Sequence, residues 1–131
     1  MDRVLVTGAT GFIGIEVSRQ LAALGLCPRL MVRRPLRGLL LKHLDVEIMQ
    51  ADLRSSRSLI RAMEGIDTVI HLGARAAFES YDRLKPSIVD GSMNLMRVAA
   101  ASGVRQVVYG GSLMIYSGSS KVIDQETPPR P

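Results

Sequence analysis

The chain has 131 residues, 47% of them apolar and 22% charged, a composition that predicts one soluble globular domain. Its one cysteine, Cys27, excludes an internal disulfide, its two histidines argue against a structural zinc site, and no run of about 20 apolar residues could span a membrane. The formal net charge of +5 favours anionic partners, while the lone cysteine and the lack of a recognisable signal peptide make a cytoplasmic protein the expectation.

In the first half of the chain, apolar runs of strand length alternate with segments of helical periodicity. The predicted strands are residues 3–6, 30–32 and 46–49, and the predicted helices are residues 12–24 and a short, poorly defined segment at 36–44. The first helix should end at Gly25, because glycine commonly closes a helix. Its buried face should consist of four apolar residues: Ile13, Val17, Leu21 and Leu24.

The second half continues the same alternation. Strands are predicted over residues 68–72 and 104–109. Ser55 or Ser56 should cap a helix that closes at Gly65. Strands that alternate with helices are typical of a parallel sheet with crossover helices, so the pattern predicts an α/β fold.

A longer helix should begin near Pro86, which is an acceptable first-turn residue, and end at Ser102. Its wide apolar face predicts burial on two sides. Tyr81 and Lys85 would then lie between the fourth strand and this helix. Residues 117–131 are rich in Gly, Ser and Pro and are predicted to form a loop.

Three glycines at intervals of three separate the first strand from the first helix: Gly8, Gly11 and Gly14. The first would allow a tight turn, the second a close approach of the backbone to a pyrophosphate, and the third close packing of helix on strand. The N–H groups at the start of the helix would bind the phosphates. The residues predicted to bind cofactor here are Gly8, Thr10, Gly11, Phe12, Ile13 and Gly14.

The sequence TGATGFIG at residues 7–14 resembles the signature of extended short-chain dehydrogenase/reductases, a family of epimerases, dehydratases and dihydroflavonol-reductase-like enzymes. Further segments resemble that family in the family's own order, and together they cover nearly the whole chain. They are residues 52–53 (DL), 71–74 (HLGA), 89–92 (VDGS), 94–95 (NL), 107–112 (VVYGGS) and 115–116 (IY).

The resemblance implies a doubly wound Rossmann sheet with strand order 3-2-1-4-5. It implies that Asp52 and Leu53 contact adenine and that three residues after the fourth strand border the cofactor's ribose: Leu72, Gly73 and Ala74. Residues 1–116 would form this NAD(P)-binding domain, and residues 117–131 a tail leading to a catalytic helix. Strands six and seven and the substrate lobe are expected to be missing from this chain.

The cofactor choice rests on the end of the second strand. NAD-binding domains of this kind place a carboxylate about 20 residues past the glycines to hold the ribose hydroxyls. Here the sequence has Arg33 and Arg34, and no Asp or Glu lies between Glu16 and Asp45. Arginine can pair with a 2′-phosphate, so NADP(H) is favoured, with NAD(H) still possible.

In the family, a Ser, a Tyr and a Lys four residues after the Tyr cooperate in proton transfer. Ser112 matches the serine, four residues before Tyr116, whereas the Tyr-x-x-x-Lys pair is not found at its expected place. The Tyr81 and Lys85 pair has the right spacing by coincidence. Ile88 also replaces the Asn usual before Val-Asp-Gly.

These observations predict the NAD(P)(H)-binding part of an oxidoreductase, epimerase or dehydratase that is not catalytically competent by itself. A non-catalytic nucleotide-sensing module is the alternative. Nucleic-acid binding is disfavoured, because the arginines cluster at a cofactor position and aromatic residues make up only 4% of the chain. The helix from Pro86 to Ser102 is expected to form a homodimer, as the corresponding helix does in the family.

Overall fold

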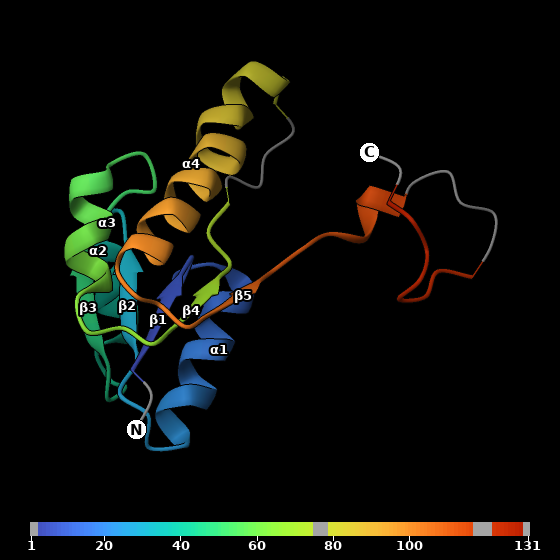
Figure 1. Cartoon of the computed structure of the whole chain (residues 1–131). Helices are drawn as coiled ribbons and strands as arrows, with labels where there is room; N and C mark the ends of the chain where they lie inside the picture. Colours follow the sequence, from blue (N-terminus) through green and yellow to red (C-terminus); the bar gives the residue numbers. More distant parts are fainter. Residues whose placement is uncertain (1–2, 75–78, 117–121, 130–131) are drawn as a thin grey trace.

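The computed structural model describes residues 3–74, 79–116 and 122–129. Five parallel strands form one sheet in the order β3-β2-β1-β4-β5, which confirms the predicted fold class and strand order (Figure 1). The strands are β1 (Val4–Thr7), β2 (Arg29–Val32), β3 (Glu47–Gln50), β4 (Thr68–His71) and β5 (Gln106–Tyr109).

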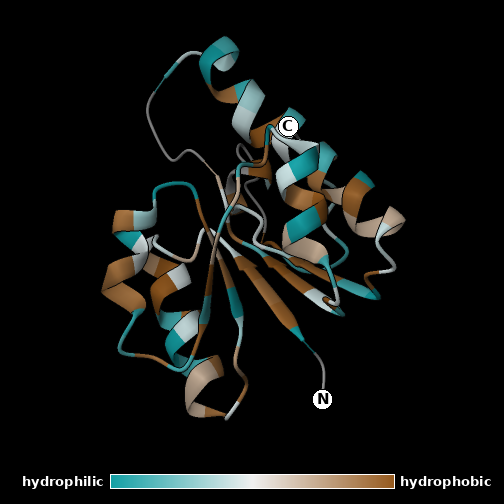
Figure 2. Ribbon diagram, turned by 90° about the vertical axis from the view of Figure 1, so that its left-hand side faces the viewer, coloured by the Kyte–Doolittle hydropathy of each residue, from teal (hydrophilic) through white to brown (hydrophobic). Residues whose placement is uncertain are grey.

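Helices cover both faces of this sheet, so that its apolar strands lie between two layers (Figure 2). One core packs α3 and α4 on the sheet around Leu5, Leu59 and Leu95. The other core packs α1 and η1 on the opposite face around Val6 and Leu41. The helical segments are α1 (Phe12–Ala23), α2 (Pro35–Gly38), η1 (Leu39–Leu41), α3 (Ser56–Met63), α4 (Tyr81–Ala101) and η2 (Leu113–Tyr116).

The buried face of α1 matches the expected one in part, because Val17 and Leu21 pack against the core. Ile13 is 61% exposed and Leu24 is 73% exposed, whereas the buried residues of the helix are Gly14 and Ser18. Gly14 is required because the start of α1 packs against the turn after β1, where a Cβ would overlap the carbonyl oxygen of Gly8. The buried hydroxyl of Ser18 donates to the carbonyl oxygen of Gly14 at 2.7 Å.

The helix expected to begin near Pro86 begins five residues earlier, at Tyr81. Pro86 therefore lies inside α4, and Tyr81 and Lys85 are part of the helix rather than of a preceding loop. Pro86 lacks an N–H group and so removes one intrahelical hydrogen bond near the start of the helix. The carboxylate of Asp82 in the first turn interacts favourably with the positive end of the helix dipole. Lys85 forms an ion pair with Asp90 at 2.6 Å.

Strand β5 forms one edge of the sheet and is poorly covered. Val108 is 47% exposed and Tyr109 is 52% exposed. Beyond β5 the chain leaves the sheet, and η2 lies apart from the α/β body (Figure 1). Among the described residues, no helix is long and apolar enough to cross a membrane.

Candidate functional site

A pocket of about 210 Å³ opens at the carboxyl ends of the strands. Five segments contribute to it: the turn after β1, the end of β2 with the start of α2, the loop after β3, the loop after β4, and one residue of α4. Open parallel sheets bind ligands in this crevice. Its lining residues are Gly8, Thr10, Gly11, Met31, Arg33, Arg37, Asp52, Leu53, Arg54, Leu72, Gly73, Ala74 and Ser87.

The turn after β1 needs its glycines because of its backbone conformation and its close contacts with neighbouring backbone. Gly8 has a φ of +70°, and a Cβ there would lie 2.6 Å from the backbone of Leu72 and 2.8 Å from the nitrogen of Gly73. A Cβ on Gly14 would overlap the carbonyl oxygen of Gly8. The turn is closed by a hydrogen bond from the Gly11 N–H to that same carbonyl at 2.9 Å. The turn therefore packs backbone against backbone, beside the pocket.

Helix α1 presents its first turn toward this end of the sheet. Its N-cap is Gly11, which supplies no capping side chain, and its first turn has no acidic residue. The N–H groups of that turn therefore remain available as hydrogen-bond donors at the positive end of the helix dipole. Phe12 and Ile13 are 96% and 61% exposed and do not line the pocket.

Three arginines line the pocket: Arg33, Arg37 and Arg54. Arg34 is exposed but does not line it. Arg29, four residues before Arg33, is instead buried in β2, where it donates hydrogen bonds to Glu47 at 2.8 Å and to the carbonyl oxygen of Ala62 at 2.9 Å. Arg29 is therefore a structural residue, and the cations beside the pocket come from two segments, the one after β2 that includes α2 and the loop after β3.

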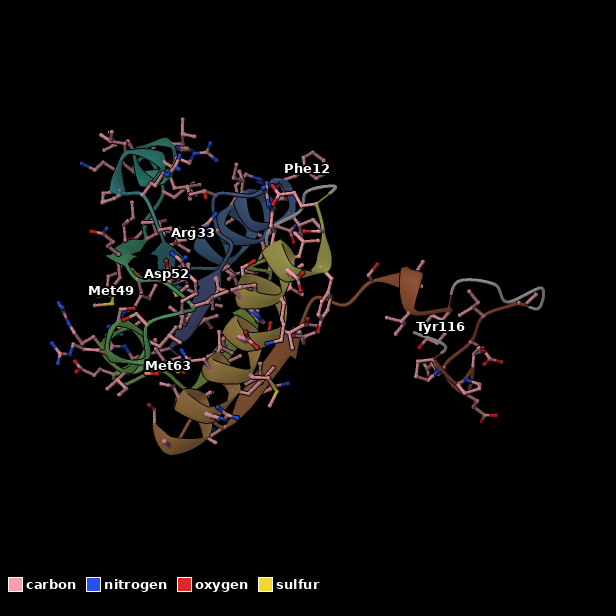
Figure 3. The ribbon with its side chains drawn as sticks, turned by 90° about the horizontal axis from the view of Figure 1, so that it is seen from above. Phe12, Arg33, Met49, Asp52, Met63 and Tyr116 are labelled. Atoms are coloured by element: carbon pink, nitrogen blue, oxygen red, sulfur yellow. The ribbon has the colours of Figure 1, made fainter. Side chains whose placement is uncertain are left out.

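One carboxylate, Asp52, lies among these cations, and Figure 3 shows it next to Arg33. Hydrogen bonds from Arg54 hold the pKa of Asp52 below its usual value, and the charge of Arg33 adds to the effect. The adjoining Leu53 is fixed from α4, because the side-chain amide of Asn94 donates to its carbonyl oxygen at 2.7 Å. A Cβ on Gly91 would lie 3.0 Å from the Cβ of Leu53, so a glycine at this position lets α4 pack closely against the loop.

A buried polar network supports the other side of the pocket. The hydroxyl of Thr7 lies 2.6 Å from Nδ1 of His71, and Nε2 of His71 lies 3.0 Å from the hydroxyl of Ser92. Thr7 Oγ1 also accepts the N–H of Gly73 at 3.1 Å. The network joins the ends of β1 and β4 to α4 and fixes the Gly73 backbone in the pocket wall. Burial lowers the pKa of His71.

Most of the cofactor-binding residues expected from the sequence come together in this pocket. Phe12, Ile13, Gly14 and Arg34 do not line it. Four lining residues were missed by sequence reasoning: Met31, Arg37, Arg54 and Ser87. Arg54 directly follows the Asp-Leu pair and Arg37 lies one helical turn after Arg33, so their spacing carried a signal, whereas nothing local marked Met31 or Ser87.

The residues considered for proton transfer are not gathered at the pocket. Ser112 and Tyr116 do not line it, and Tyr116 lies far from Arg33 and Asp52 (Figure 3). Tyr81 and Lys85 share one face of α4 but also do not line it. Lys121 lies outside the described residues. Within residues 3–74, 79–116 and 122–129, no His, Cys, Asp and Glu side chains group as metal ligands.

Comparisons with known proteins point to one family. The model of the NAD-dependent epimerase/dehydratase family matches residues 4–131. Sterol demethylase protein B of Methylococcus capsulatus is 38% identical over 110 residues, which are 82% of this chain and 34% of that protein. The 3 beta-hydroxysteroid dehydrogenase/Delta 5→4-isomerase of Mycobacterium tuberculosis is 29% identical over 130 residues, 93% of this chain and 35% of that protein. The chain thus spans about a third of the length of these relatives.

Solved structures agree with this assignment. MoeE5 in complex with UDP-glucose and NAD superimposes with a TM-score of 0.85 at 30% identity, covering 98% of this chain and 42% of MoeE5. The Y136A mutant of uronate dehydrogenase from Agrobacterium tumefaciens, complexed with NAD, gives a TM-score of 0.83 at 25% identity, covering 100% of this chain and 49% of that enzyme.

Proposed function

The chain belongs to the NAD-dependent epimerase/dehydratase family, and on that premise we propose that it is the NADP(H)-binding part of an oxidoreductase, epimerase or dehydratase. When bound, the dinucleotide would supply or accept a hydride at its nicotinamide ring. The observation that carries the proposal is the pocket at the glycine turn, where Gly8 brings its backbone against Leu72 and Gly73 and three arginines line the wall.

The residues of the pocket fit a dinucleotide phosphate at separate points. The first turn of α1 would bind the pyrophosphate through its N–H groups, with Gly11 leaving room for the phosphate oxygens. Leu72, Gly73 and Ala74 would border the ribose and exclude water from it. Asp52 and Leu53 would hold the adenine base.

The preference for NADP(H) is supported by charge. Arg33 and Arg37 line the pocket just after β2, where NAD-binding domains place a carboxylate for the ribose hydroxyls. The guanidinium of Arg33 would bind a 2′-phosphate with charge-assisted hydrogen bonds. The absence of an acid at this place in the sequence removes the repulsion that would otherwise reject that phosphate.

We propose that residues 1–116 form the binding domain, that residues 117–131 connect it to a catalytic part, and that Ser112 orients the substrate oxygen there. This chain by itself would bind cofactor without turnover. The alternative, a non-catalytic nucleotide-sensing module, is favoured by the position of Ser112 and Tyr116 outside the pocket. A homodimer through α4 would cover Val89 and Met93, which are 40% and 51% exposed.

The proposal is tested by calorimetric titration of the chain with NADPH and NADH at one salt concentration. The parent should bind NADPH at least tenfold more tightly, since a hydrogen bond to a charged group contributes about 1.5–3 kcal/mol. Arg33→Asp should reverse the preference. Arg34→Asp makes the same charge change beside the pocket and should retain it.

Two results would contradict the proposal. Tighter binding of NADH by the parent would show that the arginines do not select a 2′-phosphate. An equal loss in Arg34→Asp and Arg33→Asp would show a general effect of net charge rather than a contact made by Arg33.

A further inference from the structure

The carboxylate of Asp52 is held by its near neighbour Arg54 at three points. The Arg54 backbone N–H donates to Oδ1 at 2.9 Å, its Nε donates to Oδ1 at 3.0 Å, and its Nη2 donates to Oδ2 at 2.8 Å. Both residues line the pocket. An exposed ion pair of this kind contributes little to stability, but a guanidinium that bonds both oxygens fixes the plane of the carboxylate.

The loop that carries this pair is itself anchored. The backbone N–H of Asp52 donates to the hydroxyl of Ser58 at 3.1 Å, and that hydroxyl lies 3.2 Å from the Asp52 carbonyl oxygen. Asn94 holds the carbonyl of Leu53 from the side of α4. The backbone that carries the carboxylate is therefore anchored, and the plane of the carboxylate is fixed as well. Arg54 sets the direction in which the remaining acceptor site of the carboxylate points.

A carboxylate has about four lone-pair sites, two on each oxygen. Arg54 occupies both sites on Oδ1 and one on Oδ2. One acceptor site on Oδ2 remains for a ligand, and it can take only a donor. The same lone pair would repel a carbonyl oxygen placed there. Asp52 would therefore distinguish a base with an amino group at this place from a base with a carbonyl group.

We propose that Arg54 is a specificity-determining residue, which positions the Asp52 carboxylate to accept the exocyclic amino group of adenine and to reject a base with a carbonyl at that place. The inference rests on the proposed function, because it concerns the base end of the same dinucleotide site. Arg54 acts through Asp52: its Nε and one Nη2 donor are already engaged by the carboxylate.

The test compares NADPH with reduced nicotinamide hypoxanthine dinucleotide phosphate, in which a carbonyl replaces the adenine amino group. The ratio of the two dissociation constants is measured by calorimetry for the parent, Arg54→Met, Arg54→Lys and Arg57→Met. Arg57 is exposed on α3, does not line the pocket, and gives the same loss of charge as a matched control. The NADH pair is measured alongside, to separate the base from the 2′-phosphate.

The parent and Arg57→Met should bind the adenine form about tenfold more tightly than the hypoxanthine form, as expected for one charge-assisted hydrogen bond. Arg54→Met should reduce that ratio to about threefold or less. Arg54→Lys should give an intermediate ratio, because lysine supplies a point charge without the planar fork. The NADPH-to-NADH ratio should stay at its parent value in Arg54→Met.

A base ratio in Arg54→Met equal to that of the parent would overturn the inference. A fall in the NADPH-to-NADH ratio with no change in the base ratio would overturn it as well, and would make Arg54 a ligand of the 2′-phosphate. A parent chain that binds neither dinucleotide would overturn the proposed function and this inference together, whereas binding with an unaltered base ratio overturns the inference alone.

Discussion

At the scale of single residues, the site depends on side chains whose partners lie far away in sequence. His71 is 2% exposed and contacts the hydroxyls of Thr7 and Ser92. A buried imidazole is costly to charge, so burial lowers the pKa of His71. Thr7 Oγ1, which contacts His71, also accepts the N–H of Gly73 in the pocket wall. His71 thus helps to position that wall although it does not line the pocket.

This burial predicts a loss of stability at mildly acid pH. The folded-state pKa of His71 lies below its ordinary value of 6.5, so the unfolded chain takes up the proton first. The contribution of His71 to the free energy of unfolding is thus fully present above about pH 6.5 and declines as the pH falls toward the folded-state pKa, with a slope of at most about 1.4 kcal/mol per pH unit.

Urea unfolding at pH 7.5 and pH 5.0 measures this decline. His71→Gln, which cannot titrate, should be less stable at pH 7.5 but should lose less stability between the two pH values. His43→Gln removes the exposed histidine and should behave like the parent. A decline of the same size in His71→Gln would assign it to other groups.

At the scale of secondary-structure elements, α3 and α4 are tied to each other and to the adenine loop through one side chain. Asn94 of α4 accepts from the hydroxyl of Ser56 at 2.7 Å and donates to the carbonyl of Leu53 at 2.7 Å. The Asn–Leu pattern indicated family membership in the sequence, but its partners could not be read there because they lie 38 and 41 residues away.

Replacing Asn94 with Ala should lower the free energy of unfolding by about 1–3 kcal/mol, because it leaves the partly buried carbonyl of Leu53 without its donor. The same change should weaken NADPH binding, since Leu53 lines the pocket. Arg97→Ala, exposed one turn later on α4, serves as the control. Unfolding in denaturant checks the first effect and calorimetry the second. An unchanged free energy of unfolding and unchanged NADPH affinity in Asn94→Ala would contradict the structural role of the Asn94–Leu53 hydrogen bond.

At the scale of the whole molecule, α4 covers the sheet with one face and leaves another open. Leu95 and Ala99 are buried against the sheet, whereas Val89 and Met93 are 40% and 51% exposed. The wide apolar face of this helix in the sequence predicted burial on two sides, and within the described residues Val89 and Met93 remain exposed. The proposed homodimer would place a second copy of α4 on the open side.

Met93→Lys should therefore shift the chain toward monomer, by about tenfold or more in the dimer dissociation constant, because it places a charge in the apolar contact. Sedimentation velocity over a range of concentrations measures the shift. Ile60→Lys is the matched control, since Ile60 is also 51% exposed but lies on α3. A parent chain that stays monomeric at every concentration would rule the dimer out.

The sequence by itself determined the fold class and the glycine turn. These follow from local patterns: strand-length apolar runs, helical periodicity, and glycines whose conformational freedom and missing side chains have few other uses. The strand order came from the family resemblance of the motifs, because no local pattern fixes the order of strands in a sheet. Arg33 could be assigned to the pocket from its place directly after the second strand, since the carboxyl ends of parallel strands meet at one edge of a sheet. Asp52 was assigned through the resemblance of the Asp-Leu pair to the family's motif.

Only the tertiary structure decided which arginines face the pocket and which face of each helix is buried. Arg29 and Arg34 look alike in sequence to Arg33, yet Arg29 is buried in β2 with hydrogen bonds to carbonyl oxygens, and Arg34 is exposed and does not line the pocket. The start of α4 before Pro86 and the small-residue face of α1 likewise depend on packing. Such contacts join residues distant in the chain, and no local pattern of the sequence encodes the distance between two surfaces.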